Sequence, residues 1–242
     1  MTQLIQSVTD NAIFVLQFLG IVVAIFLVAY AFEKYSQKKQ GVKVKILTTR
    51  KIAMTGMFSA IAGVLMLIEV PLVFIAPEFY GLDLSELPVL ICGFAFGPVA
   101  GVVAEFVKII IKLFFKPTST AFVGELANFV VGCSLILPAT IIYRLKKSKR
   151  MAISACVIGT LCITIVGTIF NAVYLLPKFA QLFGMPLESI IQMGREINEH
   201  ITNITSFVVC AVAPMNLIKG TLVSVITLLI YKKISPILKH GE

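Results

Sequence analysis

The sequence predicts an all-α, polytopic membrane protein: a bundle of six core helices preceded by one extra N-terminal transmembrane helix. Hydrophobic residues make up 58% of the 242 residues and charged residues only 14%, and the mean hydropathy is +0.98. A soluble globule of this size needs more polar residues to cover its surface. The apolar residues also gather in runs of about 20, the length that crosses a bilayer as a helix.

The first apolar run, 12–32, is predicted to be an uncleaved membrane anchor. It lacks a preceding basic region, is longer than the apolar part of a usual secretory signal, and is followed by many lysines. Residues 1–49 are therefore expected to form the extra helix and a basic cytoplasmic connector. Residues 50–242 are expected to form the six-helix membrane domain.

Six further runs supply the core helices. They are 52–74, 87–96, 99–115, 122–143, 153–176 and 207–231. Gly97-Pro98 splits one long apolar block in two, because proline cannot continue a helix cleanly and glycine permits a tight turn. Residues 69–86 and 177–206 are too polar to span, and are read either as a lid over an outward cavity or as ordinary surface loops.

The basic residues set the expected orientation. Most of the 21 Lys and Arg lie in three clusters, 34–51, 144–150 and 232–239. Alternating spans place all three clusters on one face, which the positive-inside rule assigns to the cytoplasm. We therefore expect a multi-pass protein of the cell membrane with its N-terminus outside and its C-terminus inside. The net charge of +9 then reflects membrane-flanking loops and lipid contact rather than nucleic-acid binding.

Several chemistries lack their sequence motifs. The chain has no GxxxxGK[ST], HExxH or CxxC pattern, which argues against an ATPase, a zinc peptidase and a thiolate zinc site. Glu196, Glu199 and His200 are the remaining candidates for an enzymatic or metal site, and a solvated loop surface is the favoured interpretation. The sequence therefore predicts no enzyme, no metal site and no cofactor, with any energy supplied by other subunits.

Polar side chains within the predicted spans are the first candidates for function, because a charge at a helix centre costs about 2.5 to 3.5 kcal/mol on insertion scales. Lys219 lies in the middle of the last span, and Asn216 precedes it by three residues on the same helix face. Glu125 and Asn128 repeat this spacing early in the fifth span. We predict that Asn128 meets Asn216 across a pocket.

Glu125 lies nearer the interface, so two roles stay open for it. It can contact a ligand, or it can pair with Lys219, Lys108 or Lys112. Glu105, Lys108 and Lys112 form a stripe on the preceding span, which we interpret as an internally compensated seam of ion pairs facing the bundle.

Small residues form a stripe on the second span, and such spacing lets two helices approach closely in lipid. The stripe consists of Ala53, Gly56, Ser59, Ala60 and Gly63. Its interpretation is either a packing seam within the bundle or a docking surface.

Four motifs occur in order along the chain: L-D-L-S-E-L-P and F-G-P-V-A-G, then G-E-L-A-N-F and N-L-I-K-G. Over 50–239 the sequence resembles the substrate-binding S components of energy-coupling factor (ECF) vitamin transporters, and most closely their riboflavin-specific branch. The leading helix lies outside this resemblance.

The resemblance implies an outward-facing pocket that binds riboflavin as the transported ligand, with Asn128, Asn216 and Lys219 contacting the flavin. Asp83 and Glu125 are further expected substrate contacts. A pocket with one deep cation favours the unphosphorylated vitamin. The small-residue stripe would dock on a transmembrane coupling subunit driven by two ATPase subunits, although Met57 weakens its match to the family motif. The alternatives are an S component for another vitamin, or a non-transport binding or sensory subunit.

Overall fold

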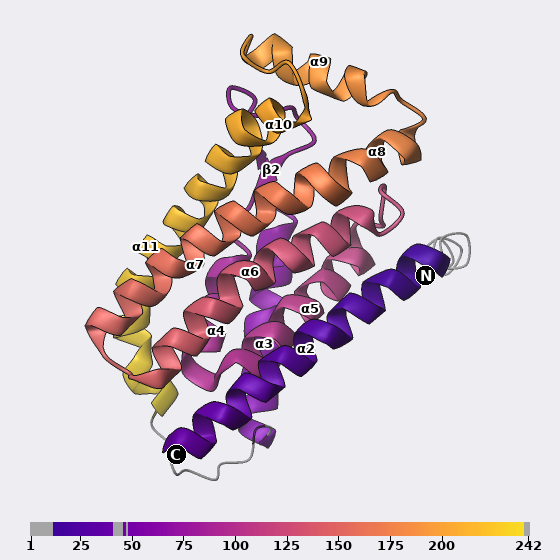
Figure 1. The fold of residues 1–242 in the computed structure, drawn as a ribbon. Helices are drawn as coiled ribbons and strands as arrows, with labels where there is room; N and C mark the ends of the chain where they lie inside the picture. The colour runs from indigo at the N-terminus through magenta and orange to yellow at the C-terminus, as the bar shows by residue number, and fades with distance from the viewer. Residues whose placement is uncertain (1–11, 41–45, 47, 240–242) are drawn as a thin grey trace.

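The computed structural model describes residues 12–40, 46 and 48–239, which form one helical bundle (Figure 1). The bundle helices are α2 (Ala12–Gln40), α3 (Thr49–Met66), α4 (Glu86–Phe96), α5 (Pro98–Phe115), α6 (Val123–Leu145), α7 (Lys149–Phe170) and α11 (Ala213–Lys239). The connecting segments contain β1 (Val70–Pro71), β2 (Gly81–Leu82), α8 (Leu176–Phe183), α9 (Leu187–Ile197) and α10 (Ile204–Phe207). Lys43 and Lys45 of the predicted basic connector lie outside the described residues.

The predicted helical membrane architecture is confirmed. Four helices of the described chain are long and apolar enough to cross a bilayer: Ala12–Lys39, Val123–Leu145, Lys149–Phe183 and Ile204–Tyr231. The helices α3 and α5 have 18 residues each and carry several charges, and α4 has only 11 residues. The expectation that six core helices span the membrane therefore stays a prediction.

The prediction of one helix over 52–74 is wrong at its end. The helix α3 stops at Met66, and the chain then forms a small antiparallel pair in which Val70 faces Leu82 and Pro71 faces Gly81. Apolar content alone suggested a span, but proline cannot donate a helical hydrogen bond and favours an extended residue before it.

The predicted break at Gly97-Pro98 is confirmed. Gly97 separates α4 from α5 with φ of +107°, a conformation that side chains with a Cβ rarely adopt. Pro98 is the first residue of α5, where its missing N–H costs nothing.

Two π-helical segments interrupt the long helices, and each ends two residues before a proline. The segment η1 (Asn171–Leu175) precedes Pro177, and η2 (Val208–Val212) precedes Pro214. Since a proline has no N–H for the carbonyl four residues earlier, the regular ladder cannot continue and a wider turn takes its place. Both segments contribute residues to the cavity described below.

The end of the bundle away from the 69–86 loop is packed with aromatic rings. Phe94 and Tyr143 stack with centroids 4.5 Å apart, and Tyr231 meets both rings edge-on. All five cysteines are free thiols. These rings pack the end of the bundle opposite the polar cavity.

Candidate substrate cavity

A cavity of about 220 Å³ lies at the end of the bundle that carries the 69–86 loop and α8. Its walls come from the loop after α3, from α5 and α6, from both π segments and from α11. The cavity brings together all five side chains that the sequence predicts as substrate contacts, namely Asp83, Glu125, Asn128, Asn216 and Lys219. The predicted juxtaposition of Asn128 and Asn216 around one pocket is therefore confirmed.

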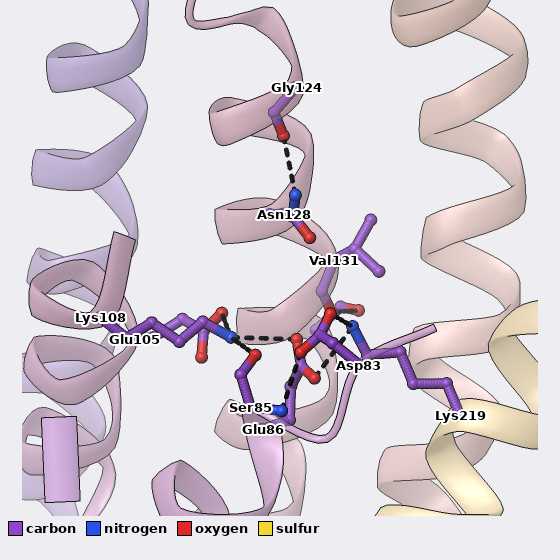
Figure 2. Close-up of polar contacts among 10 residues, drawn as sticks. Asp83, Ser85, Glu86, Glu105, Lys108, Gly124, Asn128, Val131 and Lys219 are labelled. Carbon is purple, nitrogen blue, oxygen red and sulfur yellow. Dashed lines mark hydrogen bonds and ion pairs between the residues drawn. The ribbon is translucent and has the colours of Figure 1, made fainter. Parts of the chain in front are cut away.

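Lys219 is held at the cavity wall by two carboxylates. Its Nζ donates a hydrogen bond to Oδ2 of Asp83 at 2.9 Å and forms an ion pair with Oε2 of Glu86 at 2.9 Å (Figure 2). Only 11% of the Lys219 side chain is exposed. An ammonium group has three N–H donors, so one of them remains available to a ligand while both carboxylates stay in place.

The ion pairs continue away from the cavity. Lys108 lies 3.0 Å from Glu86 and 2.7 Å from Glu105, and it donates a hydrogen bond to Oγ of Ser85 at 2.9 Å. Glu86 thus bridges two lysines (Figure 2). The predicted ion-pair seam is confirmed for Glu105 and Lys108. We call Asp83, Glu86, Glu105, Lys108 and Lys219 the charge cluster.

Two glycines make room for the polar groups of this region. A Cβ on Gly132 would collide with the carboxylate of Glu105, and a Cβ on Gly167 would lie 2.5 Å from Nδ2 of Asn216. The small residues of α6 and α7 therefore set how closely these side chains can approach the neighbouring helices.

Asn216 has an unsatisfied donor. Its Nδ2 is buried and has no hydrogen-bond partner among the described residues, although Asn216 also lines the cavity. Nearly all buried polar groups in proteins are hydrogen-bonded, and leaving one unpaired costs about 1 to 3 kcal/mol. Nδ2 lies on the side of Gly167, so a ligand acceptor would remove that cost once the amide turns toward the cavity.

Asn128 keeps donor capacity toward the cavity. Its Nδ2 donates one hydrogen bond to the carbonyl of Gly124, 3.2 Å away, one turn earlier in α6 (Figure 2). An amide nitrogen carries two hydrogens, so this bond orients the side chain and uses only one of them.

Glu125 is already well bonded. Its carboxylate accepts from Nζ of Lys112 at 2.8 Å and from the hydroxyls of Thr118 and Thr120 at 2.9 and 3.2 Å. These bonds hold the turn before α6, where Ala121 has φ of +47°. Lys112 is thus the partner of Glu125, one of the three considered, and a ligand contact by Glu125 stays a prediction.

The loop after α3 closes against the cavity through a contact that the sequence did not predict. The hydroxyl of Tyr80 donates to Oδ1 of Asn171 at 2.7 Å, and both residues line the cavity. Loss of hydration raises the pKa of Tyr80 above its usual value of about 10, so the hydroxyl stays a donor at neutral pH. The two residues are 91 positions apart, beyond the reach of any local pattern.

The small-residue stripe on α3 divides between two faces. Ala53, Gly56 and Ala60 are exposed, whereas Ser59 and Gly63 are buried. A Cβ on Gly63 would lie 2.6 Å from the side chain of Ile111 on α5. Ser59 and Gly63 therefore belong to internal packing, and a docking role stays a prediction for the three exposed residues.

The three residues considered for an enzyme lie apart from this cavity. Glu196, Glu199 and His200 line a separate depression beside Phe74 and Cys210. Within residues 12–40, 46 and 48–239, no group of three or more His, Cys, Asp or Glu side chains could hold a metal ion.

Comparison with known proteins agrees with this geometry. The family described as "ECF transporter, substrate-specific component" matches residues 50–231. The chain is 32% identical over 198 residues to the riboflavin transporter RibU of Staphylococcus aureus, covering 82% of this chain and 97% of the relative. It is 30% identical to the riboflavin transporter FmnP of Bacillus subtilis, covering 78% and 94%.

A solved structure described as the S component of a bacterial ECF transporter superposes with a TM-score of 0.62 and 33% identity. The superposition covers 78% of this chain and 98% of the solved one. All residues that line the cavity lie within the matched part of the chain, while α2 precedes it.

Proposed function

Because the chain belongs to the family of substrate-specific components of ECF transporters, we propose that it is the high-affinity riboflavin-binding subunit of such a transporter. The gathering of Asn128, Asn216 and Lys219 around one polar cavity carries this proposal. The relatives named riboflavin transporters support the choice of vitamin.

The chemistry of the cavity suits riboflavin. The isoalloxazine ring is flat and largely apolar, with an imide edge that needs donors and acceptors, and the ribityl chain carries hydroxyls. Asn128, Asn216 and the third donor of Lys219 supply polar partners, while Phe79 and Phe179 supply apolar surface. Such a combination of apolar walls and a few placed polar groups is typical of small-molecule sites.

The chain is a transporter subunit and not an enzyme, so the energy for transport comes from partners. Two ATPase subunits and a transmembrane coupling subunit are proposed to drive uptake. The exposed small residues Ala53, Gly56 and Ala60 of α3 are the proposed contact with the coupling subunit, because they allow another helix to approach closely in lipid. The basic clusters support a cytoplasmic C-terminus and a cavity that opens outside the cell.

An equilibrium titration tests binding. Detergent-purified protein is titrated with riboflavin while quenching of the flavin fluorescence is recorded. We expect saturable quenching with one site, weakened by Asn216→Ala and unchanged by Gln192→Ala, an exposed amide on α9. If riboflavin fluorescence is not quenched and another vitamin binds more tightly, the result would support the alternative, an S component for that vitamin.

An uptake assay tests energy coupling. Cells or vesicles carry this subunit with or without the coupling and ATPase subunits. Gly56→Leu is expected to reduce uptake while riboflavin binding stays normal, and Val64→Leu, at another exposed position on α3, serves as the control. Uptake that persists without the ATPase subunits would contradict the coupling proposal.

A further inference from the structure

The helix α2 precedes residues 50–231, the part of the chain that matches the family, yet it packs closely on the domain. One face is buried and comprises Phe18, Ala29, Glu33 and Ser36. The opposite face exposes large apolar side chains such as Leu16, Val23 and Leu27. A helix that only anchored the chain in lipid would need no such division into two faces.

Glu33 is the most informative residue of the buried face, because it is fully buried and charged. Its Oε2 accepts a hydrogen bond from the backbone N–H of Val99 at 3.1 Å, and its Oε1 lies 3.4 Å from Nη2 of Arg144. Arg144 in turn donates to the carbonyl of Phe96 at 3.3 Å. We call this set the latch: Glu33, Arg144, and the backbone groups of Phe96 and Val99.

The latch pairs backbone groups at two helix ends, where no intrahelical partner exists. Val99 lies in the first turn of α5, where backbone N–H groups have no intrahelical partner, and a carboxylate there also interacts favourably with the helix dipole. Phe96 is the last residue of α4. A Cβ on Gly97 would lie 2.7 Å from Nη1 of Arg144 and 3.0 Å from Glu33. The absence of a side chain at Gly97 therefore leaves room for the Glu33 carboxylate at the break between α4 and α5.

A second contact fixes the other half of α2. The ring of Phe18 meets Phe129 edge-on with centroids 6.0 Å apart and lies 6.1 Å from Phe106. Phe106 belongs to α5 and Phe129 to α6. Phe129 directly follows the cavity residue Asn128, so α2 packs behind the wall that carries this amide. Two separated anchor points on α5 and α6 define one docking surface, along which α2 runs in Figure 1.

We propose that α2 is a permanently docked accessory helix which occupies the surface formed by α5 and α6, with Glu33 as the residue that fixes it. This surface is consequently closed to other membrane subunits, and a coupling subunit docks elsewhere. Only this second consequence rests on the proposed function. Release of α2 would leave Arg144 and Val99 without their carboxylate partner, and breaking a buried ion pair by removing one member is strongly unfavourable.

Cleavage of the full chain tests the docking. A site-specific protease sequence is inserted between Lys43 and Val44, and the purified protein is cut in mild detergent and passed over a size-exclusion column. The fragment carrying α2 is expected to co-elute with the domain. Glu33→Ala is expected to release most of the fragment, Glu33→Gln less, and Leu27→Ala on the exposed face none.

The uncut Glu33→Ala protein is first checked for a monodisperse peak, so that release is measured on folded material. Separation of the wild-type fragment on cleavage, or equal retention by wild type and Glu33→Ala, would overturn the proposal. These outcomes do not depend on riboflavin, so failure of vitamin binding and failure of docking are distinguishable.

The uptake assay with coupling and ATPase subunits tests the second consequence. Leu27→Trp places a bulky side chain on the outer face of α2, and Gly56→Trp does so on the open face of α3. We expect normal uptake for Leu27→Trp and a loss of more than tenfold for Gly56→Trp, with vitamin binding retained in both. Reduced uptake by Leu27→Trp with unchanged binding would mean that the partner docks on α2, against the proposal.

Discussion

The bundle buries ionisable side chains in two places, the charge cluster beside the cavity and the latch at the break between α4 and α5. Both offset the cost of burial with ion pairs between helices. The charge cluster differs because Asp83 and Lys219 also line a cavity, whereas Glu33 is sealed between helices. Lys219 retains a donor for a ligand, but the bonds of the latch end on the protein itself.

This difference shows how a charge at bilayer depth should be interpreted. Such a residue is by default a candidate for function, yet the charge alone does not separate a ligand site from a structural contact. The two cases are distinguished by whether the charged side chain also lines a cavity. The following variants test that separation, because only changes at side chains that line the cavity should lower vitamin affinity, whereas changes at side chains sealed within the protein should lower stability.

The largest effect is expected from Lys108→Met. Lys108 is fully buried and pairs with both Glu86 and Glu105. Removing it leaves Glu105 without its cation and Glu86 with Lys219 alone, at a cost of about 3 to 5 kcal/mol. We expect a strongly lowered unfolding temperature and a smaller monodisperse fraction. Adding Glu105→Gln should recover part of the loss, and the exposed Lys146→Met is the control. Unchanged stability would show that the cluster is not ionised as described.

The second-largest effect is expected from Lys219→Met, and a comparison with Glu33→Gln distinguishes the charge cluster from the latch. Lys219→Met should weaken riboflavin binding about 10- to 100-fold, because a hydrogen bond to a charged group is worth about 1.5 to 3 kcal/mol. Glu33→Gln should lower the unfolding temperature and leave the dissociation constant within about twofold, since it removes no ligand contact. Both are measured by titration of the folded fraction. Equal loss of affinity in the two variants would remove the distinction between the regions.

A smaller effect is expected at the unpaired amide. Asn216→Ala should weaken binding about two- to tenfold, the worth of one net hydrogen bond. Gly167→Ala should have a similar effect, because the added methyl group displaces Nδ2 of Asn216. The double variant should be no weaker than either single one, which a double-mutant cycle of dissociation constants measures. Fully additive losses would mean that Gly167 acts independently of Asn216.

The smallest effect is expected from Tyr80→Phe. It removes the hydrogen bond to Asn171 that ties the loop to η1, and an indirect contact of this kind is expected to change affinity about threefold. The dissociation rate of riboflavin, followed by stopped-flow fluorescence, should rise while the association rate changes little. The exposed Tyr35→Phe on α2 is the matched control. An unchanged dissociation rate would exclude the loop as a barrier to release.

The sequence predicted the parts of this molecule that local patterns determine. Hydropathy located the helices, Gly97-Pro98 located a break, and the cost of burying amides and charges selected Asn128, Asn216 and Lys219. The end of α3 was predicted wrongly, because apolar composition continues past Met66 while the chain turns before Pro71.

Contacts between distant segments could not be predicted in this way. Lys219 pairs with Asp83 across 136 positions, and Glu33 reaches Val99 across 66. No periodicity links such residues, since their proximity follows only from how the helices pack. The same limit explains why the small-residue stripe could not be divided into its exposed and buried halves beforehand.

The most direct test of the account is the structure of the protein with riboflavin bound. We expect the vitamin in the cavity, with flavin atoms within hydrogen-bonding distance of Asn128, Nδ2 of Asn216 and Nζ of Lys219, while Glu33 still contacts Val99 and Arg144. Riboflavin bound elsewhere, or Asn216 still without a partner in the occupied cavity, would contradict it.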